Sequence, residues 1–205
     1  LTAVVMTEGW RTASLVVAIF AASVIPIFLI FFKNSPEEVG ILPYGGDHKD
    51  GAGGAAPKTA RGTISVLFLA AKKPAFWILA GTFFVCGWTT NGLIGAHFIP
   101  AAHDHGMPEG TAAGLLAVVG IFDFVGTILS GWLTDRVNPI ILLVFYYGLR
   151  GLALFTVPFV LGPQVEPPLL FFIVFYGFDW IATVPPTIEL CRKYFGINQS
   201  PTVYG

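Results

Sequence analysis

The chain has 205 residues, of which 55% are hydrophobic and only 11% are charged. A soluble domain carries roughly 25% charged residues. The composition therefore excludes an ordinary soluble domain and predicts that a lipid bilayer surrounds most of the surface. The formal net charge is −1, and Lys and Arg form no basic block along the chain. Nucleic acid is excluded as a partner, because phosphate binding needs clustered basic side chains.

Five segments are apolar enough to cross a membrane as helices, which takes about 20 mainly apolar residues. Their predicted ranges, in chain order, are residues 12–32, 74–97, 109–135, 138–161 and 168–190. The predicted fold class is all-α, a multi-span transmembrane helical bundle. Residues 1–7 and the segment after Phe195 are expected to belong to two further spans. We therefore expect the sequence to be a fragment of a longer membrane protein.

The basic residues are unequally divided between the two sides of these spans. Arg11 lies alone on one side and Arg150 lies inside a span, whereas the other side carries Lys33, Lys49, Lys58, Arg61, Lys72, Lys73, Arg136, Arg192 and Lys193. Cytoplasmic loops carry the excess of Lys and Arg, so this second side is predicted to be cytoplasmic. The only long connection, 34–73, then becomes a cytoplasmic linker, and its Gly- and Ala-rich centre is typical of a flexible chain.

Glycines, prolines and cysteines add local expectations. The third span contains Gly110, Gly114, Gly120, Gly126 and Gly131, and small residues let membrane helices approach closely. Pro185-Pro186 should kink or end the helix of the fifth span, because proline has no amide donor. Cys86 and Cys191 fall in separate hydrophobic segments, so both are predicted to be free thiols.

One cytoplasmic connection carries a family signature. Gly131-Trp132-Leu133-Thr134-Asp135-Arg136 joins two spans and resembles the G-x-L-a-D-R loop of the major facilitator superfamily. Gly9-Trp10-Arg11, before a span and the long linker, is similar to the end of that family's N-terminal half. Residues 185–196 are similar to the inner end of its tenth helix. Residues 96–123 and 146–151 resemble a bacterial branch near the monocarboxylate and oxalate/formate porters.

The resemblance implies a division of the chain. Residues 1–33 would be the end of the N-terminal bundle (the tail of helix five, and helix six), 34–73 the linker, and 74–205 a partial C-terminal bundle from helix seven to the start of helix eleven. In this family fold, two six-helix bundles bind substrate between them near the membrane midplane, and rocking of the bundles gives access to each side in turn. Gly131, Asp135 and Arg136 would form a cytoplasmic gate loop, and the location would be the bacterial inner membrane.

Three ionisable residues lie inside predicted spans. Asp123, Arg150 and Asp179 are each 12 residues from an inner anchor, Asp135, Asn138 and Cys191 respectively, which is about 18 Å along a helix. They share a depth near the midplane. Such groups mark either a functional pathway or a compensating ion pair, and we expect Arg150 to turn inward toward Asp179 or Asp123.

Other polar groups extend the predicted substrate and proton pathway. In the monocarboxylate porters, the matching helix has an Asp followed four residues later by an Arg. Here Asp123 keeps the acid, whereas Thr127 occupies the Arg position, so the charge would have to come from Arg150. Asn91, together with Thr89 and Thr90, lies in the outer half of the second span and is placed to line a substrate path.

The outer loops carry His97, His103, Asp104 and His105, but their spacing matches no closed metal-ligand set. We expect a solvated loop there and no metal. The sequence contains no phosphate-binding loop, nucleophile elbow or HExxH motif, so neither an enzyme nor a cofactor is predicted.

The predicted function is secondary active transport of a small organic anion such as a monocarboxylate, coupled to protons. The alternatives are efflux of a drug or another small solute and, more remotely, a membrane metalloenzyme at the outer histidines.

The orientation can be tested by thiol labelling. In intact cells, a membrane-impermeant thiol reagent should label a cysteine placed at Gln164 but not one placed at Ala55, because only the first is predicted to face outward. The background is a variant without Cys86 and Cys191. The reverse labelling pattern would refute the orientation and the cytoplasmic linker.

Overall fold

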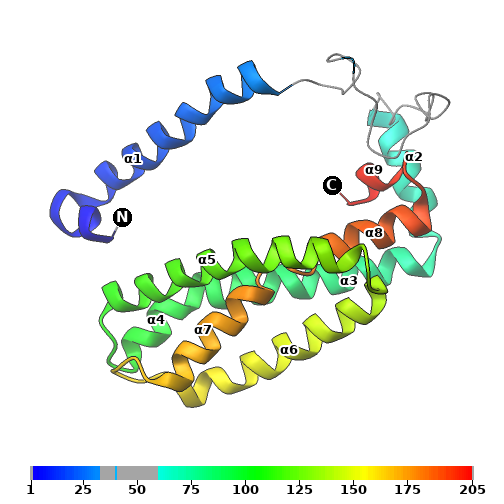
Figure 1. The fold of residues 1–205 in the computed structure, drawn as a ribbon. Helices are drawn as coiled ribbons and strands as arrows, with labels where there is room; N and C mark the ends of the chain where they lie inside the picture. Colours follow the sequence, from blue (N-terminus) through cyan, green and yellow to red (C-terminus); the bar gives the residue numbers. More distant parts are fainter. Residues whose placement is uncertain (1, 33–39, 41–59, 205) are drawn as a thin grey trace. The chain divides into compact units, whose positions relative to one another are not determined.

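A computed structural model describes residues 2–32, 40 and 60–204, and every regular element in this part of the chain is a helix (Figure 1). The chain divides into two units, Leu1–Gly54 and Ala55–Gly205. Five helical stretches are long and apolar enough to cross a membrane: Thr7–Phe31, Pro74–Asp104, Glu109–Thr134, Pro139–Val160 and Pro167–Phe195. The predicted all-α fold with five spans is thus confirmed for the described residues.

The first unit contains α1 (Thr2–Phe31). Gly9 interrupts this helix with φ +83°, a left-handed conformation that favours glycine because other residues would crowd their Cβ atom. The helix beyond Gly9 carries a continuous set of exposed apolar side chains, from Leu15 to Phe31. Such a helix is suited to lipid or to packing against other helices.

The second unit begins with the short helix α2 (Ala60–Ala71) and then forms the second span from three helical pieces. These are α3 (Pro74–Gly87), the wider π-helical segment η3 (Trp88–Gly95) and α4 (Ala96–Asp104). The span therefore ends seven residues later than the predicted residue 97. The helix continues because Phe98 and Ala102, both buried, pack into the main core.

Three helices and a terminal turn complete this unit. They are α5 (Glu109–Thr134), α6 (Pro139–Val160) and a fifth span divided into α7 (Pro167–Asp179) and α8 (Val184–Phe195), followed by α9 (Ser200–Tyr204). Proline stands at the start of α3, α6 and α7, where its missing N–H costs nothing. Asn138 caps α6 by accepting the amide of Ile140 at 3.0 Å.

The fifth span is interrupted at residues 180–183, as its two prolines predict. Asp179 is the last residue of α7, and Pro185 and Pro186 lie in the first turn of α8. The prolines can begin α8 but cannot continue α7, because each lacks the amide that an inner turn would require. The interruption lies well inside the membrane span, between helices of 13 and 12 residues.

Two glycines bring α5 and α7 into close contact. A Cβ atom on Gly126 would overlap the backbone of Phe178, and one on Gly177 would lie 2.8 Å from the Cβ of Phe122. The α7 helix lies between α5 and α6 in Figure 1. By contrast, a Cβ on Gly114 would meet no atom within 4 Å, so only part of the glycine-rich face makes the predicted close approach.

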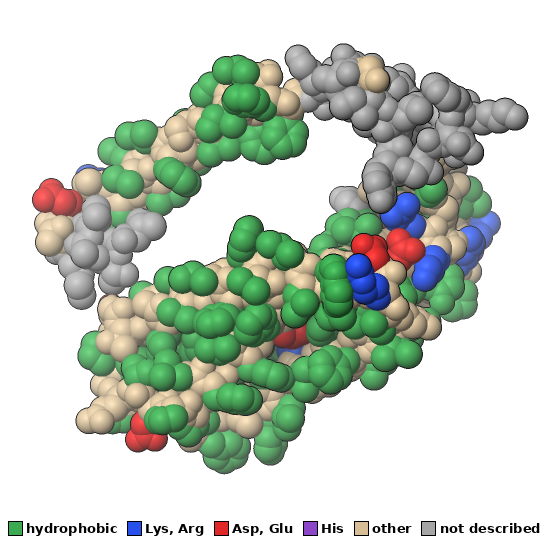
Figure 2. Space-filling view, viewed as in Figure 1, with side chains coloured by type: hydrophobic (Ala, Val, Ile, Leu, Met, Phe, Trp, Pro, Cys, Tyr) green, Lys and Arg blue, Asp and Glu red, His purple; other side chains and the backbone are tan. Residues whose placement is uncertain are grey.

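Hydrophobic side chains cover most of the visible surface of the second unit, while charged side chains gather near α8 (Figure 2). Trp77, Phe124, Val144 and Phe155 are among the large apolar residues that are more than half exposed. Lipid is the environment that such a surface requires.

The close approach of α5 and α7 predicts a difference between two glycine variants. Gly126→Ala should destabilise the purified protein by about 1–3 kcal/mol, because the added methyl forces two backbones apart. Gly114→Ala, in the same helix but with open space around it, should not destabilise. Thermal unfolding in detergent measures both, and equal midpoints for the two variants would contradict the role of Gly126.

Candidate functional site

Arg150 on α6 is almost completely buried, with 2% of its surface exposed. Its Nε donates a hydrogen bond of 2.7 Å to Oδ2 of Asp179 on α7. The side chain therefore points into the bundle, as expected from the cost of placing a guanidinium in lipid. The pair joins two neighbouring helices through a short, charge-assisted bond.

The guanidinium also binds the backbone where α7 ends. Its Nη2 donates to the carbonyl oxygens of Asp179 and Trp180 at 2.5 and 2.9 Å. The last carbonyls of a helix have no intrahelical partner, and here they lie in the middle of a membrane span. Arg150 therefore satisfies the carbonyl side of the helix break.

The remaining nitrogen, Nη1, binds the second span. It has acceptors at Thr90 Oγ1 (2.9 Å), Cys86 Sγ (3.0 Å), Thr89 Oγ1 (3.3 Å) and the carbonyl oxygen of Cys86 (3.4 Å). An arginine offers five N–H donors and no acceptor. Each guanidinium nitrogen thus has at least as many acceptors as it has hydrogens, and Arg150 retains no free donor in this arrangement.

Two tyrosines enclose the guanidinium. The rings of Tyr147 and Tyr176 both lie 5.9 Å from its central carbon, within cation–π range. Their hydroxyls donate to the carbonyl oxygens of Thr82 (2.7 Å) and Thr89 (3.1 Å) respectively. These bonds fix the rings against the second span and exclude lipid from the charged centre.

Asp123 on α5 lies in a different environment. Its Oδ1 accepts hydrogen bonds from Thr127 Oγ1 at 3.2 Å and from the amide of Ile181 at 3.0 Å. No cationic side chain contacts it in the described part of the chain. Asp123 therefore binds the amide side of the helix break whose carbonyl side is held by Arg150.

The structure thus brings most of the predicted pathway residues around the break in the fifth span. Arg150 pairs with Asp179, and Thr127 pairs with Asp123. Asn91 differs: it belongs to η3, its side chain is exposed, and it is not among the partners of Arg150. The other oxygen of Asp179, Oδ1, is buried and has no hydrogen-bond partner among the described residues.

Sequence reasoning missed four contributors to this centre: Cys86, Thr183, Tyr147 and Tyr176. Cys86 Sγ lies 3.2 Å from Thr183 Oγ1 and accepts a hydrogen bond from Arg150. Both cysteines are free, as predicted, and the structure shows that both are buried. The available signal was spacing, because Cys86 precedes Thr90 by one helical turn. A tyrosine in a membrane protein carries no comparable signal.

The predicted gate loop is open to solvent. Asp135 is exposed and makes no side-chain hydrogen bond or ion pair within the described residues. Arg136 instead donates to the Trp132 carbonyl at 3.0 Å and lies 4.1 Å from the centre of its ring. Gly131, half-buried, has open space beside it.

The outer histidines turn toward their own helices. Nδ1 of His97 lies 2.7 Å from the Gly92 carbonyl, and Nδ1 of His105 lies 2.8 Å from that of Ala101. His103 lies 4.0 Å from Asp104, with both side chains largely exposed. The part of the chain that the structure describes contains no group of three His, Cys, Asp or Glu side chains that could hold a metal ion.

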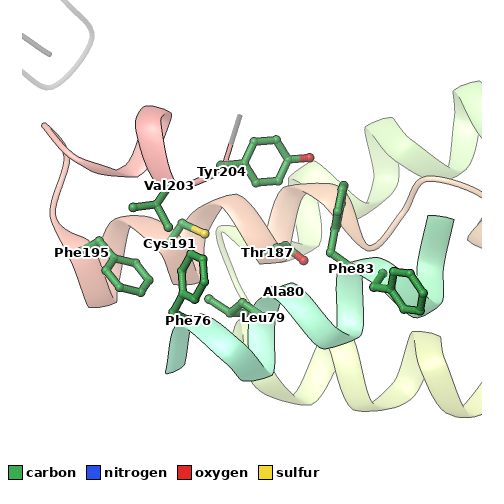
Figure 3. A pocket seen from close by; sticks show the side chains of 10 residues that line it. Phe76, Leu79, Ala80, Phe83, Thr187, Cys191, Phe195, Val203 and Tyr204 are labelled. Atoms are coloured by element: carbon green, nitrogen blue, oxygen red, sulfur yellow. The ribbon is translucent and has the colours of Figure 1, made fainter. Parts of the chain in front are cut away.

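An apolar cavity of about 330 Å³ lies between α3, α8 and α9 (Figure 3). Its lining is mainly apolar and half aromatic, and comprises Phe76, Leu79, Ala80, Phe83, Phe84, Thr187, Cys191, Phe195, Val203 and Tyr204. No charged side chain lines it, so it is suited to an apolar group and not to an anion.

The family model of the Major Facilitator Superfamily matches residues 1–205. The chain belongs to this superfamily. The match confirms the resemblance that the loop Gly131–Arg136 indicates, and the five spans of this major facilitator protein agree with the family's helical bundles.

Two curated relatives are similar to part of this major facilitator protein. Monocarboxylate transporter 12-B of Danio rerio is 34% identical over 119 residues, which are 55% of this chain and 24% of that protein. Uncharacterized MFS-type transporter YcxA of Bacillus subtilis (strain 168) is 30% identical over 108 residues, 51% of this chain and 26% of that protein. The matched regions thus span about a quarter of each relative. No solved structure matches the chain.

The buried ion pair predicts a pattern of stabilities. Arg150→Gln alone should lower the free energy of unfolding by about 3–5 kcal/mol, because it leaves the Asp179 carboxylate uncompensated. Arg150→Gln combined with Asp179→Asn should lose less, since no buried charge remains. As a control, Arg192→Gln removes a pair with Glu189 in which Arg192 is half exposed, and should cost about 1 kcal/mol or less.

These stabilities are measured by chemical unfolding of the purified protein in detergent. A double variant no more stable than Arg150→Gln alone would contradict the ion pair as the main source of the effect.

Proposed function

We propose that this protein is a secondary active transporter of a small organic anion such as a monocarboxylate, coupled to protons, and not an enzyme. The observation that carries the proposal is Asp123, a partly buried carboxylate inside a membrane span that no cation contacts in the described part of the chain. Ionisable groups in this situation are typical of proton relays in transporters. Asp123 is the proposed proton carrier, with Thr127 as its local hydrogen-bond partner.

Arg150 and Asp179 have a different part in the proposal. Because every guanidinium nitrogen is already engaged, Arg150 can bind a substrate carboxylate only by releasing some of its present partners. The contacts therefore favour the pair as a fixed tie at the centre of the pathway. Asn91, exposed on η3, is a proposed contact for substrate entering from the outer side.

The substrate class rests on family similarity and on charge. One of the two relatives is named Monocarboxylate transporter 12-B. A proton and a monocarboxylate together carry no net charge, so their joint passage avoids adding an ion to the membrane interior. Thr127, which stands where those porters have an arginine, leaves this span without its own cation.

The proposal also covers the organisation of the whole protein. We place residues 1–33 at the end of an N-terminal bundle, 34–73 in a cytoplasmic linker and 74–205 in a C-terminal bundle. Gly131, Asp135 and Arg136 would meet the other bundle at the cytoplasmic gate, where an unpartnered carboxylate can bind a positive helix end or an arginine. The proposed location is the bacterial inner membrane.

A second candidate is efflux of a hydrophobic compound. The aromatic cavity in Figure 3 favours it, because an uncharged lining binds apolar groups. Outward movement of a hydrophobic dye, with no effect of monocarboxylates on it, would select this candidate.

Uptake measurements on the full-length protein in vesicles test the proposal. Radiolabelled monocarboxylates should accumulate when an inward proton gradient is imposed. Asp123→Asn should abolish this accumulation, because the amide cannot carry the proton, while exchange of internal for external substrate continues. Glu166→Gln, an exposed change in the α6–α7 connection, is the control and should behave like the unmodified protein. Undiminished accumulation in Asp123→Asn would refute the proton-carrying role.

A further inference from the structure

The break between α7 and α8 is held by side chains of two other helices. Arg150 of α6 binds the carbonyl oxygens of Asp179 and Trp180, and Asp123 of α5 binds the amide of Ile181. A third anchor is Ser130 of α5, whose hydroxyl donates to the Ala182 carbonyl at 2.5 Å. Side chains therefore bind backbone groups of four consecutive residues, 179–182.

We propose that Arg150 is a positioning residue for Asp123. By holding the carbonyl side of the break, it positions the backbone N–H of Ile181 to donate a hydrogen bond to the Asp123 carboxylate. This inference rests on the proposed role of Asp123 as the proton carrier. It adds that proton binding at Asp123 is coupled to the conformation of the break, and that Arg150 sets the strength of the coupling.

The coupling follows from the strength of the Ile181 bond. A hydrogen bond to an ionised carboxylate is roughly twice as strong as one between neutral groups. Protonation of Asp123 weakens the bond that the Ile181 amide donates and so loosens one side of the break. By linkage, any change that moves this amide away from Asp123 favours the protonated carboxyl. Protonation of Asp123 and movement of α8 relative to α5 are thus thermodynamically coupled.

No other titratable group binds Asp123 in the described part of the chain. The elements packed against α5 are α4, α7 and α8, and their ionisable side chains are His97, His103, Asp104, Tyr176, Asp179, Glu189, Cys191, Arg192, Lys193 and Tyr194. None of these makes a hydrogen bond or an ion pair with Asp123 within the described residues. Asp179, two residues before Ile181, is paired with Arg150.

A simpler role for Arg150 would be to neutralise Asp179. The two roles differ in their contacts, because Nη2 binds only backbone carbonyls, which remain when the Asp179 carboxylate is removed. The double variant Arg150→Gln with Asp179→Asn keeps the charge balance but removes the guanidinium that holds the break. It therefore separates neutralisation from positioning.

A second variant acts on the same bond without touching any charge. Ile181→Pro removes the backbone N–H that donates a hydrogen bond to Asp123, since proline has no N–H. Ile181→Val keeps the amide and is the matched control at this partly exposed position.

The experiment measures the pH dependence of monocarboxylate uptake by the full-length protein in vesicles, for variants that remain monodisperse after purification. In the double variant and in Ile181→Pro, the midpoint, the pH at which uptake is half-maximal, should rise by about one unit or more. The reason is that the ionised Asp123 carboxylate loses the hydrogen bond donated by residue 181. Ile181→Val should keep the original midpoint. Hydrogen–deuterium exchange of residues 178–184, expressed as protection relative to the intrinsic exchange rate at each pH, should show lower protection in the double variant, and that protection should no longer depend on pH.

The outcomes separate this inference from the proposed function. Proton-driven accumulation that survives in Asp123→Asn refutes the proposed function itself. If Asp123→Asn abolishes accumulation while the double variant and Ile181→Pro retain the original midpoint, the proton site stands and the positioning role of Arg150 is overturned. If Ile181→Pro cannot be purified, the midpoint of the double variant alone decides in the same way. An unchanged midpoint in Ile181→Pro alone would also overturn the inference, because the Ile181 bond would then not set the proton affinity of Asp123.

Discussion

One buried guanidinium organises the second unit of this protein. Arg150 lies in α6 with 2% of its surface exposed, where a charge without partners would be very costly. Its partners come from the second span and from both sides of the α7 end: a carboxylate, two hydroxyls, a thiol and three backbone carbonyls. The helix break and the charge depend on each other, because the break supplies carbonyls that an intact helix would use and the guanidinium satisfies them.

Close packing of α5 against α7 gives Asp123 its access to this break. Gly126 and Gly177 allow the two backbones to approach until an added methyl would collide. At that separation a short side chain such as Asp123 reaches the Ile181 amide, and Ser130 reaches the next carbonyl. A larger residue at Gly126 would therefore disturb the polar contacts as well as the packing, so the glycines and the polar groups form one structural unit.

The sequence predicted the spans well because apolar length and flanking charges are local properties. It also predicted that Arg150 turns inward, since the cost of lipid exposure depends on depth alone. It did not predict that Asp179, and not Asp123, receives the arginine. Equal depth on three helices leaves the rotation of each helix about its axis undetermined, and that rotation follows from packing at Gly126 and Gly177. The π-helical segment and the backbone partners of Arg150 likewise depend on tertiary contacts.

The charged side chains inside the spans limit the ways in which an anion can bind there. Around the break in the fifth span, the described residues provide one cation, Arg150, and two acids, Asp123 and Asp179, and the cation is paired with Asp179 through a bond of 2.7 Å. An incoming carboxylate would meet Asp123 as a like charge unless Asp123 is protonated. A protonated Asp123 removes that repulsion and can donate a hydrogen bond to the substrate. The start of α8 is a poor alternative anion site, because Pro185 and Pro186 have no amide N–H and the amide of Val184 already donates to the Ile181 carbonyl. Under the proposed function, proton binding at Asp123 would therefore be the change that makes this part of the protein compatible with a negatively charged substrate.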